Sequence, residues 1–155
     1  MRNKTKVFVL SILIAVGIGA LSGFLTRGSM DRFEALTKPP LAPPGWLFPV
    51  VWGILFILMG ISAAIIYLSE SPQRTRALKV YTLQLIVNFF WSILFFNLEA
   101  RLFAFFWLLL LLALVLLMFV LFKRISPTAA YLQIPYILWL LFAAYLNGAI
   151  YLLNR

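Results

Sequence analysis

The sequence contains no cysteine and no histidine. Without cysteine there are no disulfides, no thiolate metal sites and no cysteine nucleophile. Without histidine there is no Ser-His-Asp triad, no imidazole general base and none of the common zinc and haem ligands. The sequence therefore predicts no metal site and no covalently bound cofactor, and it disfavours strong axial ligation of iron.

Charged residues are also scarce. They make up 11% of the 155 residues, whereas hydrophobic residues make up 65%. Soluble domains have about 25% charged and roughly 45–50% apolar residues. The composition therefore predicts an integral membrane protein. The formal net charge of +9 would suggest nucleic acid in a soluble protein. Here the basic residues lie between apolar stretches, so membrane orientation and anionic lipid headgroups explain them better, and no nucleic-acid partner is expected.

Five apolar stretches are long enough to cross a hydrocarbon core of roughly 30 Å. The predicted fold is all-α: a single domain of residues 1–155 forming a five-transmembrane-helix bundle with a long proline-rich first loop. The predicted spans are residues 7–25, 46–68, 80–97, 102–122 and 129–153. The basic N-terminal flank resembles a signal peptide, but the apolar run continues past residue 20, which favours a retained helix. The fourth span is predicted to be a lipid-facing scaffold, and Pro135 is predicted to kink the fifth.

All 13 basic and four acidic residues lie in loops or at span ends. This distribution argues against a proton-coupled pump, a voltage sensor or a channel lined by carboxylates. More basic residues lie on the N-terminal side than on the other, so the N-terminus is predicted to be cytoplasmic, in the cell membrane if the source is bacterial. The basic residues on that side are Arg2, Lys4, Lys6, Arg74, Arg76, Lys79, Lys123 and Arg124.

The long first loop is predicted over residues 26–45, and five prolines lie within residues 38–52. Prolines fix φ, remove backbone donors and push the preceding residue out of the α region. The segment therefore cannot be helical until about Gly45, and it delivers Trp46 and Trp52 onto the second helix. Such a rigid loop is either a wall of a binding site or a plain connector, and the sequence leaves both open.

Small residues recur every four positions in the first span, at Ser11, Ala15, Gly19 and Gly23. Such a ridge lets another helix approach closely. Packing within one bundle is the preferred interpretation, and a homodimer seam is the alternative.

The third span carries Gln84, Asn88 and Ser92 at four-residue spacing, beside Trp91. In lipid, these polar side chains are expected to face the bundle interior. They either hydrogen-bond between helices or contact a ligand in a cavity, and the two interpretations carry equal weight.

The fifth span carries Trp139, Ala143 and Asn147 on one face, at i, i+4 and i+8. A large ring, a methyl group and an amide in this order form a stepped wall on which a flat ligand would fit. Aromatic residues in membrane helices more often serve packing or interface anchoring, so spacing alone favours those roles.

Three segments resemble one family. Leu36-x-Lys38-Pro39, Pro43-Pro44 and the stretch from Trp46 to Trp52 resemble the first loop of the translocator protein, or tryptophan-rich sensory protein, family. Gln84-x-x-x-Asn88-x-x-Trp91 with Phe95-Phe96 resembles its third helix. Pro135-Tyr136 followed by Trp139-x-x-Phe142-Ala143-x-x-Leu146-Asn147 resembles its fifth. The motifs occur in the right order and cover nearly the whole chain.

The resemblance implies a cavity that opens toward the first loop. It also implies binding of porphyrins such as protoporphyrin IX, of isoquinoline carboxamide and benzodiazepine-type ligands, and, in some relatives, of cholesterol. The predicted ligand-binding residues are Trp46, Trp52, Gln84, Asn88, Trp91, Trp139, Phe142, Ala143, Leu146 and Asn147. Arg27, Arg32 and Lys38 in the first loop are the predicted contacts of the porphyrin propionates. Leu146, Tyr151 and Arg155 satisfy a loose sterol pattern that many membrane helices meet by chance.

Three functions follow as expectations. The first is a receptor or sensor for tetrapyrroles and lipophilic ligands. The second is an enzyme that degrades protoporphyrin IX in light and oxygen, for which the resemblance implicates Trp52 and Trp139. The third is a transporter of small hydrophobic solutes such as sterols or tetrapyrroles. No internal repeat is visible and five spans cannot form two equal inverted halves, which disfavours alternating access.

Overall fold

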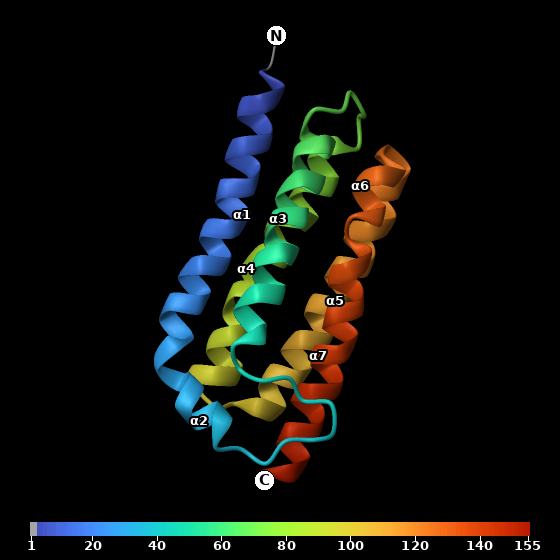
Figure 1. Ribbon diagram of the computed structural model, residues 1–155. Coiled ribbons are helices and arrows are strands. Elements are labelled where there is room, and N and C mark those ends of the chain that lie inside the picture. Colours follow the sequence, from blue (N-terminus) through green and yellow to red (C-terminus); the bar gives the residue numbers. More distant parts are fainter. Residues whose placement is uncertain (1–2) are drawn as a thin grey trace.

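The computed structural model describes residues 3–155, which form helices joined by short connections and contain no strand. Five segments are long and apolar enough to span a membrane, as predicted. Figure 1 shows them as side-by-side rods with the two termini at opposite ends. The elements are α1 Lys4–Thr26, η1 Arg27–Ser29, α2 Met30–Glu34, α3 Leu47–Tyr67, α4 Arg74–Ser92, η2 Ile93–Asn97, α5 Arg101–Ile125, α6 Pro127–Tyr131 and α7 Ile134–Leu153.

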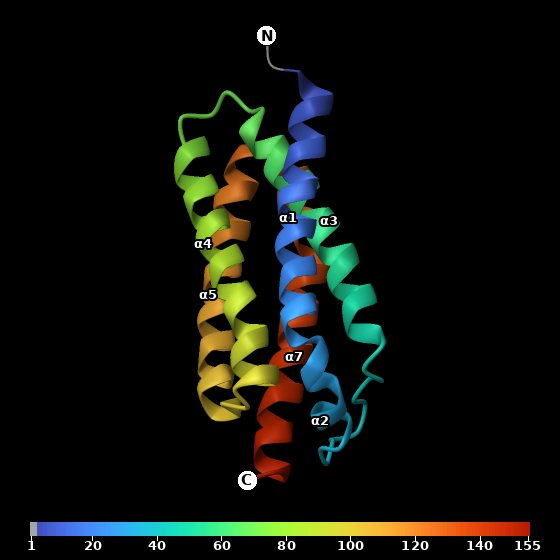
Figure 2. The same ribbon diagram turned by 90° about the vertical axis from the view of Figure 1, so that its left-hand side faces the viewer.

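The bundle is organised around two packed groups of helices. In one, α1 packs along α3; in the other, α5 packs against α4, α6 and α7. α1 also meets α4, and Figure 2 shows α1 crossing in front of the space between α3 and α4. The fourth span is therefore not simply a lipid-facing scaffold, because Leu108, Leu111, Val115 and Met118 of α5 are fully buried. An almost uniformly apolar sequence hides which face of a helix meets its neighbours.

Small residues bring α1 and α3 together. The Ser11 Oγ donates a hydrogen bond of 2.7 Å to the Gly60 carbonyl oxygen, and Ala15 is fully buried. A Cβ atom on Gly60 would lie 2.5 Å from the Cα of Ile12, so the two backbones are in direct contact there. This confirms that the ridge packs within one bundle at these positions. A homodimer seam stays a prediction.

The first loop is shorter than predicted. Residues 27–34 were expected in the loop, but they form η1 and α2, so that the first helical segment runs from Lys4 to Glu34. No proline precedes Pro39, and the chain stays helical through residues 27–34, with a 3-10 turn at Arg27–Ser29 around Gly28. The prediction about the prolines themselves is confirmed, since α3 begins at Leu47.

The non-helical connection crosses the end of the bundle and is tied to α7. The Tyr145 hydroxyl donates to the Pro40 carbonyl oxygen at 2.8 Å. Asn154 bonds the backbone of Thr37 twice, accepting from its N–H at 3.0 Å and donating to its carbonyl at 2.8 Å. In Figure 1 this segment passes beside the C-terminal end of α7. These bonds hold residues 35–46 across the mouth of the bundle.

The third and fifth spans depart from ideal helices. α4 begins at Arg74, six residues before the predicted start at 80, because its first turns are polar and hydropathy does not mark them. It continues directly into the π-helix η2, which the sequence does not predict. The fifth span is interrupted just before Pro135, which lies in the first turn of α7, where a missing donor costs little. The sequence predicted a kink at Pro135, and the structure has an interruption of the helix at residues 132–133, just before that proline.

Candidate ligand-binding cavity

A cavity of about 620 Å³ lies between α1, α2, α3 and α4, at the end of the bundle that the first loop covers. Small residues on α1 create part of this space. A Cβ atom on Gly23 would meet no other atom within 4 Å. The lining residues are Val16, Gly19, Ala20, Ser22, Gly23, Thr26, Arg27, Met30, Glu34, Gly45, Trp46, Phe48, Pro49, Trp52, Gly53, Phe56, Asn88, Ser92 and Phe96.

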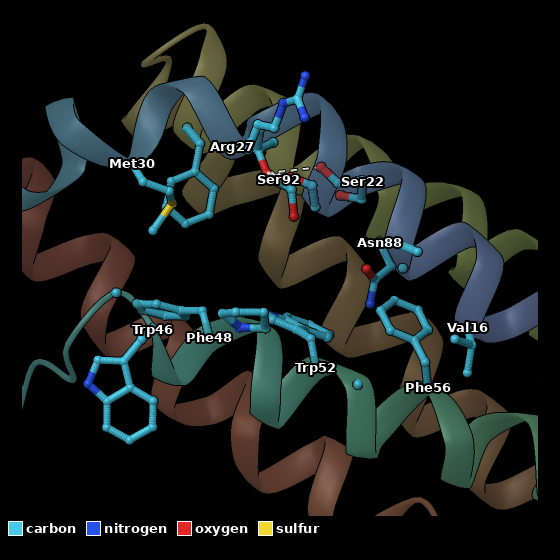
Figure 3. Close-up of a pocket in the computed structure, with 18 of the residues that line it drawn as sticks. Val16, Ser22, Arg27, Met30, Trp46, Phe48, Trp52, Phe56, Asn88 and Ser92 are labelled. Atoms are coloured by element: carbon cyan, nitrogen blue, oxygen red, sulfur yellow. Dashed lines mark hydrogen bonds between the residues drawn. The ribbon is translucent and has the colours of Figure 1, made fainter.

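One wall of the cavity is aromatic. Phe48, Trp52 and Phe56 follow one another at four-residue spacing on α3, and Figure 3 shows them in a row along the cavity. The rings of Trp52 and Phe56 are 5.7 Å apart between centroids. Phe96, from the π-helix, lines the cavity as well, and Trp46 lies at its mouth with 69% of its surface exposed. Ring faces in a row suit a flat, apolar ligand.

A chain of hydrogen bonds fixes the orientation of Asn88. The Gln84 Nε2 faces the Met59 sulfur at 3.8 Å, so its Oε1 accepts from the Tyr136 hydroxyl at 2.7 Å. That hydroxyl has only one proton, so its oxygen accepts from the Asn88 Nδ2 at 2.6 Å. The Asn88 Oδ1 is left to face the cavity, and within residues 3–155 no group donates to it. The cavity therefore presents one hydrogen-bond acceptor at its apolar end.

The three polar residues at four-residue spacing in the third span, Gln84, Asn88 and Ser92, do not share one role. Gln84 is fully buried and bonds between helices, and it does not line the cavity. Asn88 bonds between helices and also lines the cavity, whereas Ser92 lines the cavity. Hydrogen bonding between helices is confirmed for Gln84 and Asn88, and contact of Asn88 and Ser92 with a ligand stays a prediction.

Glu34 makes hydrogen bonds that connect the chain segments at the mouth of the cavity. Its Oε1 accepts a hydrogen bond of 2.9 Å from the backbone N–H of Gly45, and its carbonyl oxygen accepts one of 2.8 Å from the Lys38 Nζ. The carboxylate therefore ties the end of the first loop to α2. Lys38 is engaged in the same tie, with its Nζ 3.8 Å from the second carboxylate oxygen of Glu34.

The three basic residues predicted to contact propionates are not equivalent. Arg32 pairs with Glu99 at 2.5 Å, and neither Arg32 nor Lys38 lines the cavity. Arg27 does line it, but its guanidinium lies 3.9 Å over the ring of Phe24 and points away from the cavity in Figure 3. Arg27 must change rotamer to reach a ligand.

Most of the predicted fifth-helix residues lie behind the aromatic wall. The Trp139 ring packs perpendicular to that of Trp52, with centroids 6.4 Å apart, but Trp139 does not line the cavity. Phe142 packs on Trp139 at 5.5 Å, and Ala143 is buried away from the cavity. The stepped wall therefore does not face this cavity, and a role for these residues in ligand binding stays a prediction.

Trp91 and Asn147 serve the packing of α4, α5 and α7. The Trp91 Nε1 donates to the Asn147 Oδ1 at 3.1 Å, and the Asn147 Nδ2 donates to the Arg101 carbonyl oxygen at 2.9 Å. In the sterol pattern, Leu146 is buried in the bundle while Arg155 is exposed. The three residues of the pattern therefore do not present one common surface to lipid.

The sequence interpretation missed the contribution of α1 to the cavity. It assigned Gly19 and Gly23 to helix packing alone, yet both line the cavity. Their four-residue spacing is the signal that was available, because a run of small residues leaves space wherever no partner helix fills it. Phe48 and Phe56 follow the same periodicity as Trp52, and that periodicity also marks the aromatic wall.

The fold defines a multi-pass integral membrane protein with a largely apolar cavity near one end of its helix bundle. Residues 10–153 match the family model described as the TspO/MBR family. The chain is 39% identical over 147 residues to tryptophan-rich protein TspO of Archaeoglobus fulgidus, covering 94% of this chain and 95% of that one. It is 36% identical over 133 residues to the translocator protein of Ovis aries, covering 83% and 79%. The chain belongs to the TspO/MBR family.

A bacterial relative supports the same conclusion over nearly the full length. Tryptophan-rich protein TspO of Chlorobaculum tepidum is 34% identical over 152 residues, which cover 97% of this chain and 96% of that protein.

Proposed function

We propose that this protein is a membrane receptor that binds metal-free porphyrins such as protoporphyrin IX, together with lipophilic drug-like ligands of the isoquinoline carboxamide and benzodiazepine type. The observation that carries the proposal is the cavity of about 620 Å³ with its row of aromatic rings. Pockets for small ligands usually measure roughly 300–1,000 Å³ and combine apolar walls with a few polar groups. This cavity has both properties.

The Asn88 Oδ1 favours a ligand that carries a hydrogen-bond donor. The Asn88 Oδ1 has its orientation fixed through Tyr136, so it accepts a hydrogen bond but cannot donate one without breaking that chain. Among the proposed ligands, a secondary isoquinoline carboxamide carries an accessible N–H donor, and the flat faces of a porphyrin match the rings of Trp52 and Phe56. Arg27 is the basic residue of the lining and would pair with a propionate at the mouth.

Light-driven degradation of the porphyrin is a second function, favoured by the contact between Trp52 and Trp139. Trp52 lines the cavity and would give an electron to the excited porphyrin, which passes it to dioxygen to form superoxide. The oxidised indole would then take an electron back from the porphyrin, and the porphyrin cation would combine with superoxide, so that the net change is the addition of dioxygen to the ring. Trp139 packs against Trp52 and would share the positive charge until it returns to the porphyrin. Transport of sterols or tetrapyrroles, the alternative from the sequence, stays a prediction.

Two matched substitutions on α1 test binding at the cavity. Gly23 and Gly17 both have open space around a Cβ atom, but only Gly23 lines the cavity. The experiment titrates each purified variant with protoporphyrin IX and follows the quenching of tryptophan fluorescence. Gly23→Leu should abolish saturable quenching because its side chain occupies the ligand volume, whereas Gly17→Leu should bind like the parent protein. Equal binding by both variants would show that the ligand occupies another place.

A further inference from the structure

A second hollow lies on the outside of the bundle, at the end that carries the N-terminus. It measures about 470 Å³ and shares no lining residue with the ligand cavity. Its wall consists of one face of α4 together with the last residue of α3. The residues that matter here are Tyr67, Arg74, Leu78, Lys79, Leu83 and Ile86.

The upper part of this groove carries two basic side chains. The Arg74 Nη1 donates to the Tyr67 carbonyl oxygen at 3.0 Å, and its guanidinium lies 5.6 Å from the centre of the Tyr67 ring. The guanidinium is thereby held at the rim of the groove. Lys79 follows five residues later, about 7.5 Å further along the helix axis, and is exposed. A single phosphate group can contact both side chains, because lysine extends its ammonium toward the membrane surface.

The lower part of the groove is apolar. Leu83 and Ile86 continue the same face of α4 toward the middle of the membrane, and about half of each side chain is exposed, 48% and 50%. The groove thus changes from cationic to apolar along the membrane normal. A phospholipid has the same order of chemistry, with a phosphate above and acyl chains below.

The charge of this end of the bundle favours an anionic headgroup. Its basic residues within the described chain are Lys4, Lys6, Arg74, Arg76, Lys79, Lys123 and Arg124. Within residues 3–155, Glu70 is the one acidic residue at this end, and it does not line the groove. Asp31, Glu34 and Glu99 lie at the opposite end. Clusters of basic residues at a membrane surface attract anionic lipids.

We propose that this groove binds one anionic glycerophospholipid of the surrounding bilayer. Its phosphate lies between Arg74 and Lys79, and one acyl chain lies along Leu83 and Ile86. The site is independent of the porphyrin cavity and of the function proposed for it.

Native mass spectrometry of the full-length, delipidated protein tests this site. The protein is titrated with phosphatidylglycerol and with phosphatidylcholine carrying the same acyl chains. The parent protein should retain one phosphatidylglycerol in preference to phosphatidylcholine. Replacing both basic residues, Arg74→Gln with Lys79→Gln, should weaken phosphatidylglycerol binding by about tenfold or more. Lys79→Gln alone should weaken it in the same direction, and it keeps the bond between Arg74 and Tyr67 intact.

The matched control removes the same charge from the same end of the bundle. The double variant Lys123→Gln with Arg124→Gln lies on α5, outside the groove, and should bind phosphatidylglycerol like the parent. Equal losses in both double variants would overturn the site in favour of diffuse electrostatic attraction. Equal retention of the two lipids would overturn the role of the basic residues. Competition by glycerol phosphate at concentrations similar to the lipid would overturn the role of Leu83 and Ile86.

Discussion

The indole rings of Trp52 and Trp139 meet at 90° with their centroids 6.4 Å apart, and only Trp52 lines the cavity. Trp139 therefore lies one ring away from any ligand in the cavity. Direct stacking on a ligand is available to Trp52 alone, whereas a redox role is available to both. Binding and degradation therefore make different demands on the pair.

Substitution of either indole by phenylalanine separates binding from degradation. In Trp52→Phe and Trp139→Phe the affinity for protoporphyrin IX should change by less than about threefold, because phenylalanine keeps an aromatic face. Bleaching of the bound porphyrin in light and air should fall to the rate seen in empty detergent micelles. Trp46→Phe, at the exposed mouth, is the control and should bleach at the parent rate. If both variants bleach porphyrin like the parent, the redox role is wrong.

The acceptor on Asn88 predicts a preference for ligands with an N–H donor. Asn88→Ala should lower the affinity for a secondary isoquinoline carboxamide by about 3–10-fold, the usual effect of one lost hydrogen bond. The N-methylated tertiary amide of the same compound has no N–H, so the substitution should leave its affinity unchanged. Ser92→Ala removes a different polar side chain from the same cavity and serves as the control. A loss that is equal for both compounds would contradict the orientation of Asn88.

The carboxylate of Glu34 predicts how fast a ligand leaves. Glu34→Ala removes the acceptor of the Gly45 N–H and frees the end of the first loop. Dissociation of protoporphyrin IX, followed by stopped-flow fluorescence, should accelerate by about 3–10-fold. Asp31→Ala changes the same charge on the same short helix without touching the loop, and it should leave the rate unchanged. Acceleration in both variants would point to a general charge effect.

The sequence predicted those features that depend on local chemistry. Apolar runs marked all five spans, and the prolines at 39, 40, 43 and 44 correctly delayed the start of α3 until after Gly45. The position of Trp52 in the cavity followed from its place in the first turns of that helix. In each case the feature depends on the local residues alone: proline restricts the backbone, and a long apolar run requires a membrane around it. Knowledge of the tertiary contacts is therefore not needed.

The features that the sequence did not predict depend on which helix faces pack against one another. The spacing of Trp139, Ala143 and Asn147 correctly placed them on one face of α7, but it did not say that Trp139 packs on Trp52 of α3 while Asn147 bonds to α4 and α5. Residues 27–34 are rich in charged side chains but are helical, because such side chains do not by themselves break a helix. The π-helix η2, which brings Phe96 to the cavity, has no local signature in the sequence.

The contact between Gly60 and Ile12 predicts the cost of a single methyl group at the α1–α3 seam. Gly60→Ala places a Cβ atom 2.5 Å from the Ile12 Cα and 2.9 Å from its backbone nitrogen, so the helices must move apart. Overpacking of this kind costs about 1–3 kcal/mol, which should lower the midpoint of thermal unfolding in detergent.

Gly53→Ala makes the same change on the same helix where a Cβ atom meets nothing within 4 Å, so α3 gains helix propensity without a clash. Its unfolding midpoint should be equal to or above that of the parent, because alanine is favoured over glycine in a helix by about 1 kcal/mol. If both variants lose stability equally, the loss reflects glycine removal from α3 in general. If neither does, α1 and α3 are not in backbone contact at Gly60. Only destabilisation confined to Gly60→Ala agrees with a seam in which the hydrogen bond from Ser11 holds two backbones together.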